Sequence, residues 1–491
     1  MAVVVALTPR VGFAMLFRPS PEFRLWDTWL YIADDEFHLY FAQGPAGGRH
    51  NSIGHAVSPD LIHWKSLGSV VQHGPSEWER YPRYASGTVI RHGDRHLMFQ
   101  AGRGRGIGIT MMSSTDLHQW TKHPDDPVFT ITDPYYDRIG DPYVYRVSNG
   151  YEMLCQARLP GPVRCIARLF SKDLMHWETR PPIATPKVSQ HEVPEYFPMG
   201  GKHYLTFSAC GGRPGCVKSD LVVDTESRRD TAGTYYVIAD EREGPYVMPE
   251  DSLFVGSGNG RIDSYVARTF LWNGQRMVYY HNVGLRPGGC DPVLSQASLA
   301  APKIVRQNAD GALWNEYWPG LAGLETGILV DTFQGSTPSA TGWTAKPNVL
   351  VGRKSNTAPF MLARVAADAH LTCTVNLEPA GRAAVIVRYD DQSKVGTALV
   401  LDAMSGDVEV TRMEDGRFTM LDAVASGIEA GESYKVRIFA RAEFVDWYVD
   451  DRLVFSTAIN DVPLIGRIGF AVDNTTASFT HLRIAALEEL P

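Results

Sequence analysis

The 491-residue sequence has few cysteines, no long hydrophobic run and no cluster of basic residues. Its six cysteines show no Cys-x-x-Cys spacing, which argues against a zinc site and favours reduced thiols, with a Cys210–Cys216 disulfide left open. No apolar stretch is long enough to cross a bilayer. The net charge of −8, without a basic run, argues against nucleic acid as a partner.

The apolar N-terminal stretch, residues 1–17, lacks the early positive charge of a signal peptide, and Pro9 and Arg10 interrupt it. We therefore interpret it as an opening strand and expect a cytoplasmic protein without membrane contact. The sequence also lacks HxH and HExxH spacings, so neither a metal nor a cofactor is predicted. Lone histidines such as His55, His191 and His281 are interpreted as structural or substrate-contacting residues.

A seven-residue motif, SxDLxxW, occurs three times, and its aspartates lie 56 and 57 residues apart. A fixed period of this size with strand-like content indicates the blades of a propeller. Each copy follows an alternating strand and is typical of a turn in which Ser and Asp accept backbone hydrogen bonds while Leu and Trp pack inward. The copies are Ser58–Trp64, Ser114–Trp120 and Ser171–Trp177.

Short alternating segments separated by turn residues fill the chain, without a convincing amphipathic helix of three turns between Leu25 and Tyr317. Five blades fit that stretch. Leu321–Val330 is interpreted as a linker, and about a dozen further alternating strands predict a two-sheet sandwich. We therefore predict an all-β chain, with a five-bladed β-propeller catalytic domain at residues 1–320 and a C-terminal β-sandwich domain at residues 331–491.

Three carboxylates, Asp27, Asp141 and Glu192, stand at equivalent places, each opening a predicted blade. The first strand of every propeller blade lines the central channel, so residues at strand starts converge on one mouth. Acids gathered there repel one another, which raises the pKa of at least one of them. Glycoside cleavage needs this pattern, because one carboxylate must be ionised and another must carry a proton for the leaving group.

Several segments also carry a family resemblance, which covers nearly the whole chain. In order and spacing they resemble glycoside hydrolase family 32, the β-fructofuranosidases of the five-bladed propeller clan, whose second domain is also a sandwich. The resemblance implies a small carbohydrate substrate and a reaction without metal. The segments are IGHAVSPDLIHWKSLG at 53–68, ASG at 85–87, GDPYVY at 140–145, EVPEYF at 192–197 and DSYVARTFLWNGQRMVYY at 263–280.

The resemblance also implies a role for each matching residue. Asp27 is expected to be the nucleophile, Glu192 the general acid/base and Asp141 the carboxylate that holds sugar hydroxyls and stabilises the transition state. The other candidates are substrate-binding residues: Gln43 and Ser86 match sugar-contacting positions of the family, and Trp26, Asp263 and Tyr265 fall near the same pocket.

Two departures from the family pattern concern sugar recognition. WDTWL replaces the usual Asn-Asp-Pro-Asn-Gly around the nucleophile, and Gly140 replaces the arginine that grips ring hydroxyls, so a bidentate donor is lost unless Arg138 or Arg158 substitutes. We expect a retaining hydrolase of a fructoside or related furanoside. An inverting arabinofuranosidase-like hydrolase, a fructosyltransferase and an inactive sugar-binding protein stay open, and the oligomeric state is not predicted.

Overall fold

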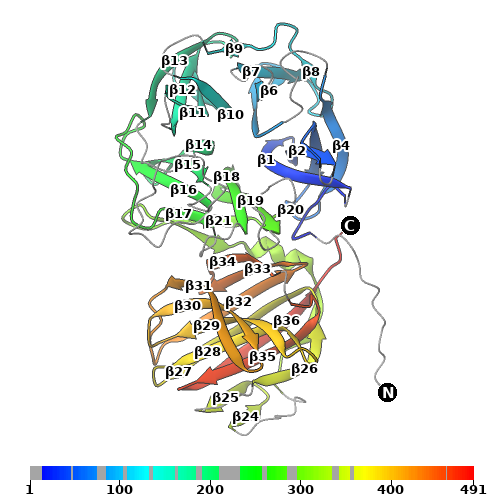
Figure 1. Cartoon of the computed structure of the whole chain (residues 1–491), viewed down its shortest axis with the longest axis vertical. Helices are drawn as coiled ribbons and strands as arrows, with labels where there is room; N and C mark the ends of the chain where they lie inside the picture. Colours follow the sequence, from blue (N-terminus) through cyan, green and yellow to red (C-terminus); the bar gives the residue numbers. More distant parts are fainter. Residues whose placement is uncertain are drawn as a thin grey trace.

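The computed structural model is built almost entirely of strands, with a ring of sheets joined to a two-sheet sandwich (Figure 1). No helix in the described part of the chain is long and apolar enough to span a membrane. The structure describes residues 14–20, 22–45, 48–74, 84–102, 108–131, 136–160, 164–183, 191–209, 233–256, 263–284, 296–333, 342–353, 359–459 and 462–490.

Five antiparallel groups of strands consecutive in the chain form the ring: four are separate sheets, and the fifth is one end of a 13-stranded sheet that continues into the sandwich. Their strands are β1 (Phe23–Ala33), β2 (Glu36–Pro45), β3 (Ser52–Ser58) and β4 (Lys65–Gln72); β5 (Gly87–His92), β6 (Arg95–Gly102), β7 (Gly108–Ser114), β8 (Thr121–Lys122) and β9 (Phe129–Thr130); β10 (Arg138–Val147), β11 (Gly150–Arg158), β12 (Arg164–Ser171) and β13 (Trp177–Ile183); β14 (Glu192–Met199), β15 (Lys202–Ala209), β16 (Gly233–Ala239) and β17 (Leu253–Gly256); and β18 (Ser264–Trp272), β19 (Gln275–Gly284), β20 (Gln296–Leu299), β21 (Lys303–Gln307) and β22 (Leu313–Tyr317).

The first strands of the five sheets lie next to one another around the ring. Strand β1 contacts β5, β5 contacts β10, β10 contacts β14, β14 contacts β18, and β18 contacts β1 again. Each first strand therefore faces the propeller axis, and the predicted five-bladed propeller is confirmed. The last blade ends at Tyr317, which is the end of the stretch that the sequence assigns to the five blades.

The SxDLxxW motif forms the turn between the third and fourth strands of blades one to three. In the third copy, Ser171 Oγ accepts hydrogen bonds from the amides of Asp173 (3.2 Å) and Leu174 (2.8 Å). Asp173 Oδ1 accepts from the amides of Met175 and His176, and the indole of Trp177 donates to the Leu174 carbonyl at 3.0 Å. The predicted turn chemistry is confirmed in all three copies.

The C-terminal strands form two sheets that face each other across one apolar core, to which Leu371, Val385 and Phe470 belong. The predicted sandwich is confirmed. One sheet contains β34 (Arg452–Ala458), β33 (Phe444–Val449), β32 (Ser433–Arg441), β27 (Ala369–Glu378), β36 (Thr476–Leu487), β25 (Val349–Arg353), β24 (Trp343–Lys346) and β23 (Glu325–Val330); the other contains β26 (Phe360–Ala366), β35 (Gly466–Asp473), β28 (Arg382–Asp390), β29 (Val395–Asp402), β30 (Asp407–Glu414) and β31 (Arg417–Ala425).

The segment between the two parts, interpreted from the sequence as a linker, forms ordered secondary structure. It forms the 3-10 helix η2 (Pro319–Leu324) and then β23, which pairs with β36 of the sandwich. The physical reason is burial: the side chains of Leu321 and Leu324 are fully buried. We propose residues 1–320 and 331–491 as domain limits and assign the intervening residues to neither.

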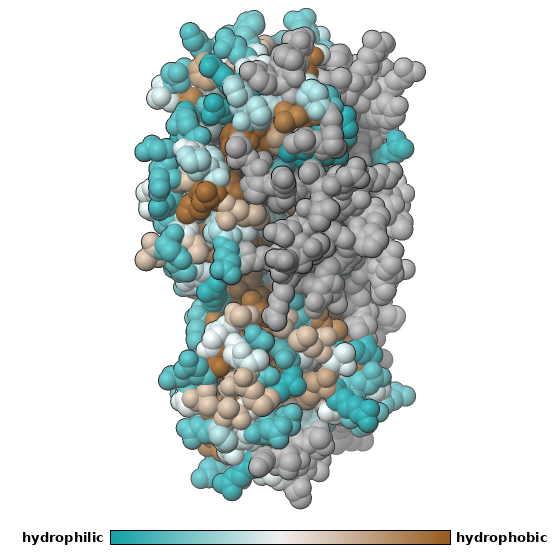
Figure 2. Space-filling view, turned by 60° about the vertical axis from the view of Figure 1, so that its left-hand side comes forward, coloured by the Kyte–Doolittle hydropathy of each residue, from teal (hydrophilic) through white to brown (hydrophobic). Residues whose placement is uncertain are grey.

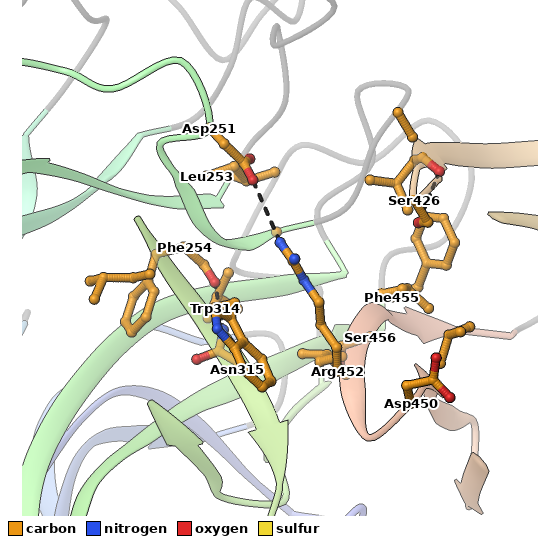
Figure 3. A pocket seen from close by; sticks show the side chains of 18 of the residues that line it. Asp251, Leu253, Phe254, Trp314, Asn315, Ser426, Asp450, Arg452, Phe455 and Ser456 are labelled. Atoms are coloured by element: carbon orange, nitrogen blue, oxygen red, sulfur yellow. Dashed lines mark hydrogen bonds and ion pairs between the residues drawn. The ribbon is translucent and has the colours of Figure 1, made fainter. Parts of the chain in front are cut away.

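A polar pocket of about 470 Å³ lies where the propeller meets the sandwich (Figure 3). Arg452 projects across it, within 3.7 Å of Asp251 and above the ring of Trp314. On the face seen in Figure 2, the described residues are mostly hydrophilic, with hydrophobic residues in small groups. The buried cysteines Cys155, Cys165 and Cys373 are free thiols, whereas Cys210 and Cys216 lie outside the described residues.

Candidate active site

Two of the candidate catalytic acids occupy the same place in their blades. Asp27 sits in a bulge of β1 between Trp26 and Thr28, with φ of 42°, and Asp141 sits in the bulge of β10 that follows Gly140, with φ of 50°. A side chain other than glycine in this left-handed region carries a conformational cost, and bulges of this kind re-aim side chains next to active sites. The bulges direct both carboxylates away from the regular pleat.

Glu192 does not occupy that place, which corrects the expectation of three equivalent acids. The bulge of β14 follows Glu192, and its left-handed residue is Val193, with φ of 50°. Glu192 is therefore the last paired residue before the bulge of β14, as Trp26 is in β1 and Gly140 is in β10. This position lies one residue before the one that Asp27 and Asp141 occupy. The sequence places all three acids at strand starts, but it does not show where each strand bulges.

Contacts between neighbouring first strands draw the acids together. The hydroxyl of Tyr265 on β18 donates to Glu192 Oε2 at 2.6 Å, and the amide of Val193 donates to Asp141 Oδ2 at 3.4 Å. The ring of Trp26, which precedes Asp27, lies 6.3 Å from the ring of Tyr265. Asp27 and Asp141 are buried, whereas Glu192 is partly exposed. Strands β1, β18, β14 and β10 thus build one acidic site at their N-terminal ends.

The remaining predicted substrate residues lie at the same end of the blades. Gln43 is buried on β2, where its amide nitrogen donates to Ser69 Oγ at 3.0 Å, and Ser86 is buried just before β5. Gln43 Oε1 and Ser86 Oγ have no hydrogen-bond partner among the described residues, and such oxygens suit sugar hydroxyls. Asp263 is buried immediately before β18, and its backbone carbonyl accepts from the Val283 amide at 2.8 Å.

Two histidines contact Trp26, and only one of them was singled out from the sequence. The ring of His281 lies 4.6 Å from that of Trp26, and the ring of His50 stacks on it at 6.4 Å. Burial lowers the pKa of His281 to about 3, so this imidazole is neutral at physiological pH. His50 stands alone in a Gly-rich stretch and carries no sequence signal for this position.

A second layer of polar residues lies directly after the bulges: Tyr143, Glu195 and Arg268. Burial raises the pKa of Glu195, whose carboxylate accepts from the amide (2.7 Å) and hydroxyl (2.8 Å) of Thr269. Arg268 is buried, donates to the Gly87 carbonyl at 2.8 Å and lies over the ring of Tyr143. This layer was missed from the sequence, because its members share no motif.

The family arginine that Gly140 replaces has no simple substitute in Arg158. Its Nε donates to Asp137 Oδ1 at 2.7 Å, which holds the guanidinium beside that carboxylate. Arg138, the Cα partner of Arg158 across β10 and β11, is exposed. Of the two arginines named from the sequence, one is therefore paired with Asp137 and the other is exposed at the start of β10.

Residues 28–282, just over half of the chain, match the Glycosyl hydrolases family 32 N-terminal domain, and the match includes four of the five first strands and part of β1. The chain belongs to glycosyl hydrolase family 32. The match contains Asp141, Glu192, Gln43, Ser86 and Tyr265 and begins one residue after Asp27.

The named relatives of the chain are distant in sequence. The chain is 24% identical over 286 residues to a sucrose-6-phosphate hydrolase of Vibrio alginolyticus, covering 55% of this chain and 56% of the relative. It is 26% identical over 269 residues to an insoluble β-fructofuranosidase, isoenzyme 6, of Oryza sativa, covering 49% and 44% of the two chains. The chain thus spans about half the length of these relatives.

Solved structures of the family share the fold over nearly the full length. The fructan 1-exohydrolase IIa of Cichorium intybus superposes with a TM-score of 0.72 at 13% identity, over 98% of both chains. The β-fructofuranosidase of Bombyx mori superposes with a TM-score of 0.69 at 15% identity, over 98% of this chain and 94% of that one. At these identities the likeness concerns the fold alone.

Proposed function

We propose that this family 32 protein is a retaining glycosidase that hydrolyses a furanoside, a fructoside or a related small oligosaccharide. The observation that carries the proposal is the arrangement of two aspartates on matching bulges beside Glu192, whose Oε2 accepts the Tyr265 hydroxyl at 2.6 Å. Relatives include hydrolases of sucrose 6-phosphate, and solved neighbours have been captured with sucrose and with 1-kestose. Those ligands support the proposal that a sugar binds at the end of the propeller channel where the three acids lie.

In the proposed mechanism, Asp27 attacks the anomeric carbon and the glycosidic bond breaks. Glu192 gives its proton to the leaving oxygen, so the alcohol departs neutral and a glycosyl-aspartate remains. Glu192 then takes a proton from water, whose oxygen displaces Asp27. Tyr265 engages one Glu192 oxygen and leaves the other for the proton, while Asp141 is proposed to hold hydroxyls of the ring that flattens in the transition state.

The other candidate residues receive positioning roles in the proposal. Gln43 Oε1 and Ser86 Oγ offer buried acceptors for sugar hydroxyls. Trp26 offers an aromatic face for the sugar ring, and Asp263 is proposed to line the edge of the site immediately before β18. Residues 331–491 are proposed to support the propeller. A cytoplasmic location, as expected from the sequence, stays part of the proposal.

The first prediction tests the two acid roles. Glu192→Ala should lose nearly all turnover of a natural furanoside, because general acid help is worth about 10²–10⁴-fold and most for poor leaving groups. It should still form the covalent intermediate from an aryl furanoside, and azide should accelerate its turnover by replacing activated water. Asp27→Ala should fail on both substrates. Steady-state rates with and without azide measure this, and surviving aryl-furanoside turnover in Asp27→Ala would reverse the assignment.

The second prediction concerns specificity and stereochemistry. Gly140 leaves the site without the family guanidinium, so sucrose and long fructans should be weak substrates compared with another furanoside or an unusual fructoside. A panel of fructosides, arabinofuranosides and galactofuranosides, with the product anomer followed by NMR, measures both properties. Retention of configuration is expected. Inversion would favour the arabinofuranosidase-like alternative, and sucrose turnover at invertase rates would show that Gly140 does not matter.

A further inference from the structure

A cluster of histidines and one glutamate lies between blades one and two, away from the candidate catalytic acids. Glu36 and His38 lie on β2, and His118 lies on the blade-two SxDLxxW turn. One ligand atom from each of these three side chains lies within 4.8 Å of the others. His38 is buried, while Glu36 and His118 are accessible from solvent. Two imidazoles and a carboxylate are the donor set that zinc and similar divalent transition metals prefer.

The orientation of His38 suits a metal ligand. Its Nε2 faces Glu36 Oε2 at 3.5 Å, and its Nδ1 lies 3.1 Å from Nε2 of the fully buried His55. With the proton on Nδ1, His38 donates to His55 and keeps the Nε2 lone pair toward Glu36. Metal-binding histidines usually have their second nitrogen held in this way, which sets the tautomer and the ring plane.

The turn that carries His118 is held firmly against blade one. The Tyr40 hydroxyl on β2 donates to the Leu117 carbonyl at 2.6 Å, and the rings of Tyr40 and Trp120 meet edge to face at 5.7 Å. The His118 ring lies 5.6 Å from that of His38 and 5.2 Å from that of His55. The backbone positions of the cluster are therefore fixed from both sides before any ion binds.

The internal repeat of the chain provides a reference for this cluster. In the first and third turns the sixth motif residue is histidine, and His63 and His176 bind the aspartate of their own turn at 2.6 and 2.8 Å. In the second turn the sixth residue is Gln119, and the histidine stands one place earlier, where it faces His38. Turn capping accounts for His63 and His176 but not for His118.

The strand positions differ between blades in the same way. Glu36 lies directly after the first hairpin of its blade, and the register places Arg95, Gly150, Lys202 and Gln275 at the matching positions of the others. Two residues further along, His38 corresponds to Leu97, Glu152, Tyr204 and Met277. Only blade one combines an acid and a histidine there, beside a turn that supplies a second histidine.

We propose that Glu36, His38 Nε2 and His118 bind one zinc-like divalent cation, with His55 orienting His38. In a tetrahedral site with metal–nitrogen bonds of about 2.0–2.1 Å, the donor atoms lie about 3.3 Å apart, and rotation of the exposed Glu36 and His118 side chains closes that gap. Three protein ligands leave a fourth position for water.

The proposed cation joins two blades and takes no part in glycoside cleavage. His38 pairs with Tyr31 across the first hairpin, at the opposite end of β1 from Asp27. Four residues of strand, or about 13 Å, separate the two positions. The ion would act as a cross-link between strand β2 of blade one and the SxDLxxW turn of blade two. This inference does not rest on the proposed function.

Titration calorimetry of the untagged full chain, stripped with EDTA, tests this site. Wild type should bind one equivalent of Zn²⁺ and gain thermal stability as Zn²⁺ rises, because the ion binds only the folded state. His118→Ala, a change at an exposed position, should weaken Zn²⁺ binding about tenfold or more, and Glu36→Gln should also weaken it. His176→Ala, at the exposed histidine of the third turn, should bind as wild type does. Ca²⁺ and Mg²⁺ should not compete.

Equal Zn²⁺ affinity in wild type and His118→Ala would overturn the proposal, as would the absence of stoichiometric binding in wild type. Furanoside turnover at 25 °C should be the same with and without EDTA and in His118→Ala. Failure of the metal site would therefore appear in the titration alone, and failure of the proposed function would appear in the turnover alone.

Discussion

Two candidate catalytic aspartates, Asp27 and Asp141, hold backbone conformations that most side chains avoid. Each left-handed residue costs on the order of 1–3 kcal/mol unless its surroundings offset the cost. Both are also carboxylates buried in one mouth, where like charges oppose each other. Strain and repulsion at the same residues agree with the proposed roles of Asp27 and Asp141 in the reaction, which would come at the expense of stability.

The third prediction follows from this conflict. Asp27→Asn keeps a residue that tolerates positive φ and removes one charge, so the free energy of unfolding should stay equal or rise, by about 1 kcal/mol at most, while turnover falls to background. Urea unfolding and turnover of the same preparations measure the two effects. Asp34→Asn is the matched control, because Asp34 has φ of 50° at an exposed hairpin turn and should change neither quantity.

A lower stability of Asp27→Asn would mean that the Asp27 carboxylate is held by net favourable contacts. The strain would then be structural, and the catalytic assignment would lose this support.

Among the elements, the three repeated turns show how a short motif determines a conformation. Leu61, Leu117 and Leu174 all have φ between 65° and 69°, which leucine rarely adopts, yet all three side chains are buried. The cost is offset because the preceding serine and aspartate accept the free amides of the turn. Contacts with His176 and with backbone amides hold the pKa of Asp173 below its usual range despite desolvation.

The fourth prediction concerns the pH dependence of this turn. A carboxylate whose pKa is lowered on folding adds stability above its unfolded pKa of 3.8 and loses it as pH falls through the folded pKa. Asp173→Asn should therefore lower the free energy of unfolding by about 0.5–1 kcal/mol at pH 7, a small value because the side chain is half exposed. Urea titrations at pH 7 and pH 3 should show a smaller difference at pH 3. An equal difference at both pH values would exclude the charge as the cause.

The same elements show what the sequence could predict. A turn repeated at 56 and 57 residues is a local signal, so the blade frame, the strand starts and the acids near them could be inferred. The offset of Glu192 could not, because a bulge depends on pairing with the neighbouring strand. The order of segment 321–330 could not be inferred, because Leu321 and Leu324 are buried in a core that residues of both parts share. The Glu36–His38–His118 cluster gave no motif, since its members meet only through folding.

In the whole molecule, the propeller and sandwich are joined by polar groups as well as by apolar packing. Strand β22 pairs with β34 through Glu316 and Arg452, which continues the sheet of blade five into the sandwich. Lys303 on β21 binds Asp446 on β33 at 2.7 Å, with both side chains fully buried. Lys303 also donates to the Ala301 carbonyl and lies over the ring of Tyr280. We propose that this buried charge pair helps to determine how the two parts dock.

The last prediction measures that coupling. Removing one partner of a buried ion pair leaves an uncompensated charge, so Lys303→Met should lower the free energy of unfolding by about 3–5 kcal/mol. The double variant, Lys303→Met with Asp446→Leu, should recover most of that free energy. Urea unfolding of the single and double variants gives the interaction free energy. Arg452→Ala is the control: its partner Asp251 lies 3.7 Å away and both side chains are largely exposed, so its cost should stay below about 1 kcal/mol. If the double variant is as unstable as Lys303→Met, the pair acts through packing around Tyr280, and the charge does not determine the docking.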